Sequence, residues 1–167
     1  MSLFVISQIL IGVAICSDIV SFQFKERTHI VGCLFVSCIF ISLHFMCLGH
    51  WTAACLALVS AGRFLTSLYS TSRIFLGIFI GSAVLLSALT YEGILSLLGC
   101  TGAVFSTVAS FSRNDKLLRE LMFISTTIWL IHNYLAGSPG AVLMEVFFLS
   151  SNLVGYFRYY IRPRKQI

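Results

Sequence analysis

The sequence predicts an all-α integral membrane protein, a bundle of seven spanning helices. Of its 167 residues, 58% are hydrophobic and 10% are charged, whereas about 25% of the residues of a soluble domain carry a charge. Apolar stretches long enough to cross a bilayer fill the chain, and none alternates with the period of two that a barrel strand requires. Six of these stretches form two matching sets of three with a solitary stretch between them, which predicts two parallel three-helix repeats joined by a linker helix.

The apolar stretches, separated by short turns, give the expected spans. They cover residues 3–24, 30–48, 52–69, 74–90, 94–111, 121–136 and 141–160. A spanning helix needs about 20 apolar residues, so a chain of this length has room for about seven. The first stretch lacks the positive segment of a secretion signal and is longer than a signal's apolar region, so we expect it to be retained.

Positive charge orients the expected bundle. Ten of the eleven Lys and Arg residues follow the first, third, fifth and seventh stretches: Lys25, Arg27, Arg73, Arg113, Lys116, Arg119, Arg158, Arg162, Arg164 and Lys165. With seven spans they all lie on one side, and the opposite turns contain neither Lys nor Arg. The positive-inside rule therefore predicts an outer N-terminus and a cytoplasmic C-terminus. The net charge of +5 is explained by this topology, and no nucleic-acid partner is expected.

An internal repeat appears when residues 10–69 are laid over residues 98–157 without gaps. Identities are few, but the basic turn at Lys25 falls on Arg113, and His44 falls on His132. The expected domains are a first three-helix repeat (1–71), a linker helix (72–92), a second repeat (93–161) and a basic cytoplasmic tail (162–167). A single linker helix gives both repeats the same orientation in the membrane, and a site between them is a recurring arrangement in transporters.

The stretches "WLIHNYLAGSPGAVLMEVFFLSSNLVGYFR" (129–158) and "HFMCLGHWTA" (44–53) resemble the YgjV family of bacterial inner-membrane proteins. The resemblance covers nearly the whole chain and implies a multi-pass protein of the bacterial inner membrane, but no established activity. The three-one-three plan is similar to SWEET and PQ-loop transporters, which hold small solutes between two triplets; this is an analogy of fold alone. Those transporters carry hinge prolines in the first two helices of each triplet, whereas this chain has only Pro139 and Pro163, neither inside such a helix.

Polar residues within spans are the candidates for solute contact, because each is costly in hydrocarbon. Asn152 lies two turns from Glu145 on one face of the last span, near its middle, and Ser60 and Arg63 share a face of the third. Resemblance to the SWEET transporters implies a solute contact at Asn152, and Trp129 is expected to line the same cavity. An interhelical hydrogen bond is the alternative role of Asn152. The expected function is a transporter or facilitator of a small polar solute; the alternative is a membrane sensor or assembly partner.

A second group of candidates is expected near the outer surface. His132, Asn133 and Glu145 are placed at one depth, and His44 occupies the matching turn of the first repeat. A histidine beside a carboxylate would form a proton path or polar gate. The alternative is that both histidines cap the last carbonyls of their helices at the membrane interface.

Asp18 and Arg63 lie at comparable depths in the first and third spans, which predicts an ion pair. The pair would act as a structural clamp within one triplet or as a contact for the solute. Gly77 and Gly81 form a G-x-x-x-G pattern in the linker helix, which favours either close packing within the chain or a homodimer seam.

Catalytic motifs are missing from the sequence, so no enzymatic activity is expected. The six cysteines show no metal-type spacing and are interpreted as packing residues, with a Cys47–Cys55 disulfide left open. No metal and no cofactor are expected.

Overall fold

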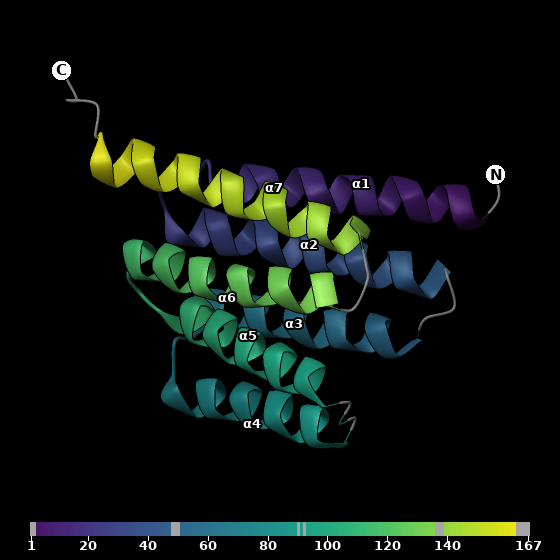
Figure 1. Cartoon of the computed structure of the whole chain (residues 1–167). Helices are drawn as coiled ribbons and strands as arrows, with labels where there is room; N and C mark the ends of the chain where they lie inside the picture. The colour runs from purple at the N-terminus through teal and green to yellow at the C-terminus, as the bar shows by residue number, and fades with distance from the viewer. Residues whose placement is uncertain (1–2, 48–50, 90, 92, 136–138, 163–167) are drawn as a thin grey trace.

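The computed structural model describes residues 3–47, 51–89, 91, 93–135 and 139–162, apart from the side chains of 45, 51–56 and 139–141. The described residues form seven α-helices and one π-helical turn, arranged as a bundle of long, roughly aligned helices (Figure 1). The helices are α1 (Leu3–Ser21), α2 (Arg27–Cys47), α3 (Trp51–Tyr69), α4 (Arg73–Leu89), α5 (Ile94–Phe111), α6 (Asp115–Leu135) and α7 (Pro139–Tyr156), and η1 (Phe157–Ile161) continues α7.

The all-α class and the seven helices expected from the sequence are confirmed. Within the described residues, α1, the segment Arg27–His44 of α2, and α5 are long and apolar enough to cross a membrane, and α4 is a shorter apolar helix. Many large apolar side chains face outward, such as Ile74 and Leu89 of α4, each 73% exposed. Such an apolar outer surface is suited to contact with the lipid of a membrane.

The sixth helix begins earlier than expected from hydropathy. Residues 115–120 are rich in charge and were placed in a turn, but α6 already starts at Asp115. Asn114 caps it, because its Oδ1 accepts hydrogen bonds from the backbone N–H groups of Lys116 (2.9 Å) and Leu117 (3.2 Å). The first turns of α6 are therefore amphipathic, with Leu118 and Met122 buried.

The turns after α1, α3 and α5 lie at the same end of the bundle as η1, and α1 begins at the opposite end (Figure 1). We call this the basic end, because these turns and the helix starts that follow them carry the Lys and Arg residues: Lys25, Arg27, Arg73, Arg113, Lys116, Arg119, Arg158 and Arg162. Arg164 and Lys165 lie outside the described residues. The charge separation expected from the sequence is thus present in the fold.

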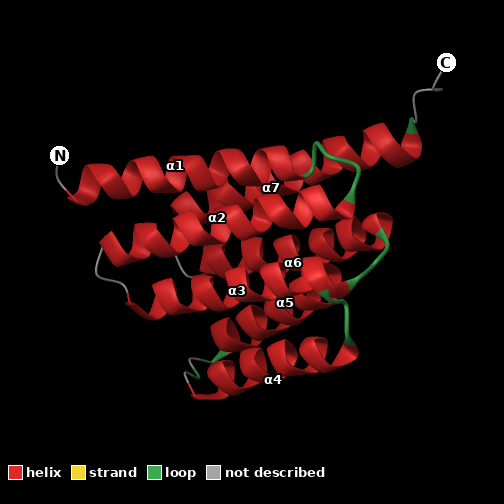
Figure 2. Ribbon diagram, turned by 180° about the vertical axis from the view of Figure 1, so that it is seen from behind, coloured by secondary structure: helices red, strands yellow, loops and turns green. Residues whose placement is uncertain are grey.

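Helix packing follows a simple order. Helix α2 packs against both α1 and α3, and α6 packs against both α5 and α7. Between these two groups, α1 packs against α7 and α3 packs against α5. Helix α4 packs on α5 at the edge of the bundle, as the view from behind also shows (Figure 2).

The apolar core lies toward the basic end. It joins α1, α2, α3, α5 and α6 through the cluster Phe22, Ile30, Val31, Leu34, Phe64, Ala109, Leu118 and Met122. Phe22 also meets Phe148 of α7 edge to face, with ring centroids 4.9 Å apart. The cluster and Phe148 of α7 therefore pack together at the basic end, where most of the charged residues also lie.

Candidate functional site

Buried polar side chains gather along two interfaces between helices. We call them the α1–α7 seam and the α3–α5 seam, because each joins one helix of the α1–α3 group to one helix of the α5–α7 group. In a membrane protein, polar groups inside the bundle must find partners or face water, so their contacts indicate either structure or function.

Arg119 is the centre of the α1–α7 seam. Its side chain is fully buried. Its Nη1 donates to the backbone oxygen of Phe22 (2.9 Å), and its Nη2 donates to the backbone oxygen of Phe24. Its guanidinium also lies 5.5 Å from the ring centre of Phe22 and 5.4 Å from that of Tyr159. Phe22 and Phe24 lie in the turn that follows α1, so Arg119 of α6 satisfies the buried backbone carbonyls of this turn.

Ser151 of α7 completes this seam, and its neighbour Asn152 bonds to α6 within the same helix group. The Asn152 Nδ2 donates to the backbone oxygen of Arg119 (2.9 Å), while its buried Oδ1 has no partner among the described residues. The Ser151 hydroxyl donates to the backbone oxygen of Ile19 and accepts a hydrogen bond from Nε2 of Gln23 (3.0 Å). Asn152 therefore makes the interhelical hydrogen bond that was the alternative to solute contact.

The depth of Asn152 differs from the expectation of a position near mid-membrane. Its partner Arg119 lies only four residues into α6, so Asn152 sits toward the basic end. The helical path continues past α7 through η1 to Ile161, and sequence hydropathy counted this extension as part of the span.

Arg63 is the centre of the α3–α5 seam. It is 8% exposed, and its Nη1 donates to the hydroxyls of Ser106 (2.9 Å) and Thr107 (3.0 Å). Its Nε has no partner among the described residues. Ser60 lies half-buried one turn earlier on the same helix.

The expected ion pair between Asp18 and Arg63 is not formed in the described part of the chain. Arg63 points across to α5 and uses its donors on hydroxyl groups there. Asp18 is buried on α1, which packs on α2 and α7. Helices α1 and α3 each pack mainly on α2 and make few contacts with one another.

Asp18 is buried on α1, and Glu145 lies half-buried on α7, the helix that packs against α1 between the two groups. The two acidic residues come from different helix groups, so they bring ionisable chemistry to the interface between those groups.

The outer cluster of His132, Asn133 and Glu145 is not assembled among the described residues. His132 Nδ1 lies 3.1 Å from Oδ1 of Asn133, its neighbour in the chain, and its ring packs edge to face against Trp129 with centroids 5.0 Å apart. His44 is buried and its Nδ1 lies 2.8 Å from the backbone oxygen of Ser7 on α1. His44 thus links α2 to α1 and is no exposed cap.

Trp129 packs against α5. A Cβ added to Gly102 would lie 2.8 Å from Nε1 of Trp129, so the indole occupies the space that this glycine leaves. The expected role of Trp129 in lining a central cavity gives way to close packing of α5 against α6. Gly77 and Gly81, by contrast, have open space at their Cβ positions and lie exposed on α4, so the homodimer seam stays a prediction.

Two arginines of these seams, Arg119 and Arg27, were not predicted as functional candidates, because basic residues at the ends of spans indicate topology alone. Arg27, like Arg119, donates to backbone carbonyls of other segments. Its Nη2 donates to the backbone oxygens of Ser67 (2.7 Å) at the end of α3 and of Ser110 at the end of α5. The helical pattern indicates that Arg119 is buried, because it follows Leu118 and lies three residues before Met122, and both of these residues are buried. For Arg27 the sequence held no such signal.

No group of three or more His, Cys, Asp or Glu residues within the described part of the chain is arranged to hold a metal ion. Cys47 is a free thiol, and the side chain of Cys55 lies outside the described residues.

Comparison with known proteins gives two matches. Residues 5–163 match the family model Imp-YgjV, described as a bacterial inner membrane protein. The chain is also similar to the inner membrane protein YgjV of Escherichia coli (strain K12), with 29% identity over 145 residues, covering 87% of this chain and 76% of the relative. No solved structure matches the chain.

Proposed function

The chain belongs to the Imp-YgjV family of bacterial inner membrane proteins, and we propose that it is a transporter or facilitator of a small polar solute. The solute would pass between the α1–α3 triplet and the α5–α7 triplet, with α4 as the linker. The observation that carries the proposal is that the two triplets meet along two polar seams.

Hydrogen bonds that recur in register support the repeat. The Ser37 hydroxyl donates to the backbone oxygen of Ala14 (3.3 Å), and 88 positions later Ser125 donates to that of Gly102 (2.8 Å). These bonds link the first two helices of each triplet in the same way.

One contact in each seam between the triplets also fits this register. Arg63 of the first triplet contacts Thr107 of the second, and the positions 88 residues away from these are Ser151 and Ile19, which are also joined by a hydrogen bond. If the α1–α3 triplet and the α5–α7 triplet change places, α1 takes the position of α5 and α3 that of α7. The packing pair α1–α7 then becomes the pair α3–α5. This exchange is what a two-fold axis along the membrane normal requires.

Hydrogen bonds between the triplets cluster toward the basic end, where Arg27 and Arg119 each bridge the seam. By the positive-inside rule this end faces the cytoplasm. The present conformation is therefore interpreted as closed on the cytoplasmic side, and the two arginines would have to release their carbonyl partners for passage.

The solute chemistry follows from the polar groups that the fold leaves without partners. Among the described residues these are Oδ1 of Asn152, which is an acceptor, and the Nε atoms of Arg27, Arg63 and Arg119, which are cationic donors. A solute with hydroxyl or amide donors and a partial or full negative charge suits this combination. Asp18 and Glu145 add carboxyl groups that would bind protons or a cationic part of the solute.

Solute flux in proteoliposomes tests the proposal. We expect at least one member of a panel of sugars, amino acids and organic acids to enter faster than into protein-free vesicles. Asn152→Ala should lower that flux by about five- to tenfold, as expected for one lost hydrogen bond to the solute. Ser150→Ala is the matched control, because the exposed Ser150 hydroxyl bonds only within α7, to the Val146 oxygen (2.7 Å).

The roles of Asp18 and Glu145 are tested by separate variants. Asp18→Asn and Glu145→Gln should each reduce flux, whereas Glu26→Gln, an exposed carboxylate in the turn before α2, should not. If no solute of the panel crosses and affinity purification recovers a stable membrane partner, the sensor or assembly function replaces the transporter.

A further inference from the structure

A second polar site lies at the basic end, where α3 and α5 end, and it uses none of the seam residues described above. It is a cavity of about 450 Å³ lined by Thr71, Arg73, Leu76, Val108, Phe111, Ser112, Arg113 and Leu117. These residues come from the α3–α4 turn, the start of α4, the end of α5 and the start of α6. One part of the lining is cationic and hydroxylic, and the other part is apolar.

The cationic part is oriented by the fold. The Nε of Arg113 donates to Oγ1 of Thr71 (2.8 Å), which fixes the direction of a side chain that is otherwise exposed. Arg73 is exposed at the first position of α4, where Ser72 caps the helix by accepting from the N–H of Ile74 (3.2 Å). Two guanidinium groups and a helix N-terminus therefore favour negative charge here.

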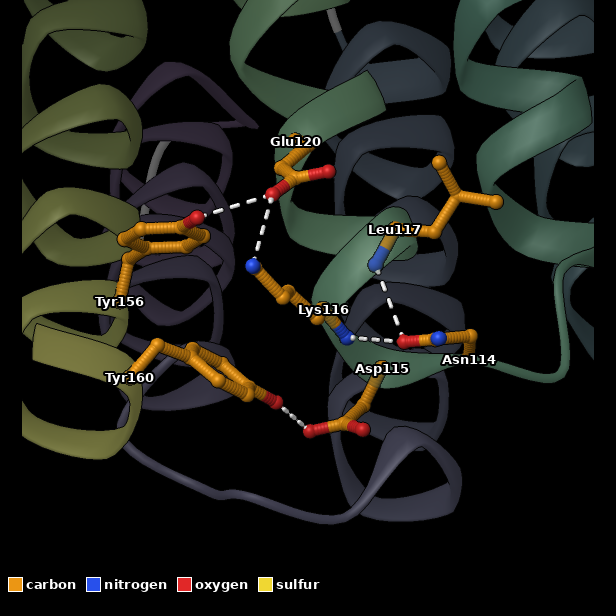
Figure 3. Close-up of polar contacts among 7 residues, drawn as sticks. All are labelled: Asn114, Asp115, Lys116, Leu117, Glu120, Tyr156 and Tyr160. Carbon is orange, nitrogen blue, oxygen red and sulfur yellow. Dashed lines mark hydrogen bonds and ion pairs between the residues drawn. The ribbon is translucent and has the colours of Figure 1, made fainter. Parts of the chain in front are cut away.

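Acidic side chains are turned away from this cavity. None of its lining residues is acidic. On α6, Asp115 accepts a hydrogen bond from the hydroxyl of Tyr160, and Glu120 accepts one from that of Tyr156 (2.8 Å). Figure 3 shows both carboxylates directed toward these tyrosines, while the side chain of Leu117 points to the other side of the helix. The arginines of the cavity thus lack a neutralising partner on its walls.

The apolar part matches a lipid tail. Leu117 is 44% exposed beside the cavity, and Ile74 and Phe75 of α4 are exposed next to Arg73. Basic pockets between membrane helices at the bilayer surface are suited to anionic lipid headgroups, with the acyl chains lying along adjacent apolar side chains.

We propose that this cavity binds the phosphate group of an anionic phospholipid such as phosphatidylglycerol, held by Arg73 and Arg113 with Thr71 as a positioning residue. The assignment is independent of the transport proposed above, since it uses no residue of the seams. A lipid bound there would connect α4 to the second triplet at the membrane surface.

Native mass spectrometry of the full chain tests this assignment, with phosphatidylglycerol and phosphatidylcholine of equal acyl chains as probes. We expect the wild type to retain one phosphatidylglycerol in preference to phosphatidylcholine. Arg73→Gln and Arg113→Gln should each weaken retention about fivefold, the effect of one basic residue near an anionic surface. Arg113→Lys should weaken it less than Arg113→Gln, because charge is kept while the paired hydrogen bonds are lost.

Lys25→Gln is the matched control, since it removes one exposed positive charge from the same end but outside the cavity. Equal loss in Lys25→Gln and Arg113→Gln would show general charge attraction and overturn the site. Displacement of the lipid by millimolar inorganic phosphate would overturn the lipid as its source. Unchanged melting temperatures among the exposed arginine variants are expected, so a folding defect would be visible separately.

Discussion

Gly155 of α7 lies against the carbonyl of Phe22 so closely that a Cβ at this position would be 2.0 Å from the Phe22 oxygen. The same added atom would be 2.5 Å from Nη1 of Arg119, the group that caps this carbonyl. No side chain larger than hydrogen fits between the two helices. The contact between the triplets therefore depends on a glycine at this position.

Gly155→Ala should lower the free energy of unfolding by about 1 to 3 kcal/mol, because the Cβ would overlap backbone atoms, which cannot move aside as a flexible side chain does. Reversible unfolding in mixed micelles measures the change. Gly62→Ala in α3 is the matched control, since its Cβ meets nothing within 4 Å. Equal stability of the two variants would mean that α7 and α1 are not in this close contact.

Arg119→Lys should destabilise the fold although it keeps the charge. A lysine ammonium cannot reproduce the planar fork that donates to Phe22 and Phe24 together, so we expect a loss of about 1.5 to 3 kcal/mol. Arg158→Lys, an exposed substitution at the same end, should leave the stability unchanged. Chemical denaturation of the three proteins provides the comparison, and unchanged stability of Arg119→Lys would contradict its role in holding the turn after α1.

Hydropathy and charge were sufficient to predict the class, the number of helices and the end at which the basic residues meet, because each depends only on local composition. Partners inside the bundle were not predictable in this way. Asp18 and Arg63 were paired by depth alone, but their helices each pack mainly on α2 and make few contacts with one another. Arg119 was assigned to a turn because charge near an apolar stretch has the same sequence signature whether it is solvated or bonded to the backbone carbonyls of a neighbouring turn.

Ser37→Ala and Ser125→Ala should both weaken the bundle, since each removes the equivalent bond between the first two helices of a triplet. Interhelical hydrogen bonds in membranes contribute about 0.6 kcal/mol on average. Ser82→Ala is the control, since its exposed hydroxyl bonds only to Ile78 within α4. Free energies of unfolding for the four proteins provide the measurement.

Double-mutant cycles distinguish the partner of Arg63. Arg63 donates to Thr107 at 3.0 Å, so Arg63→Gln and Thr107→Val should show a coupling energy of at least about 0.5 kcal/mol in the free energy of unfolding. Arg63→Gln and Asp18→Asn should instead be additive within about 0.5 kcal/mol, because their helices make few contacts with one another. If Arg63→Gln instead rescued the stability lost in Asp18→Asn, the ion pair expected from the sequence would be supported. Arg63 would then no longer be the central donor of the α3–α5 seam. The two-fold relation between the seams would lose the Arg63–Thr107 contact, which corresponds to the bond between Ser151 and Ile19.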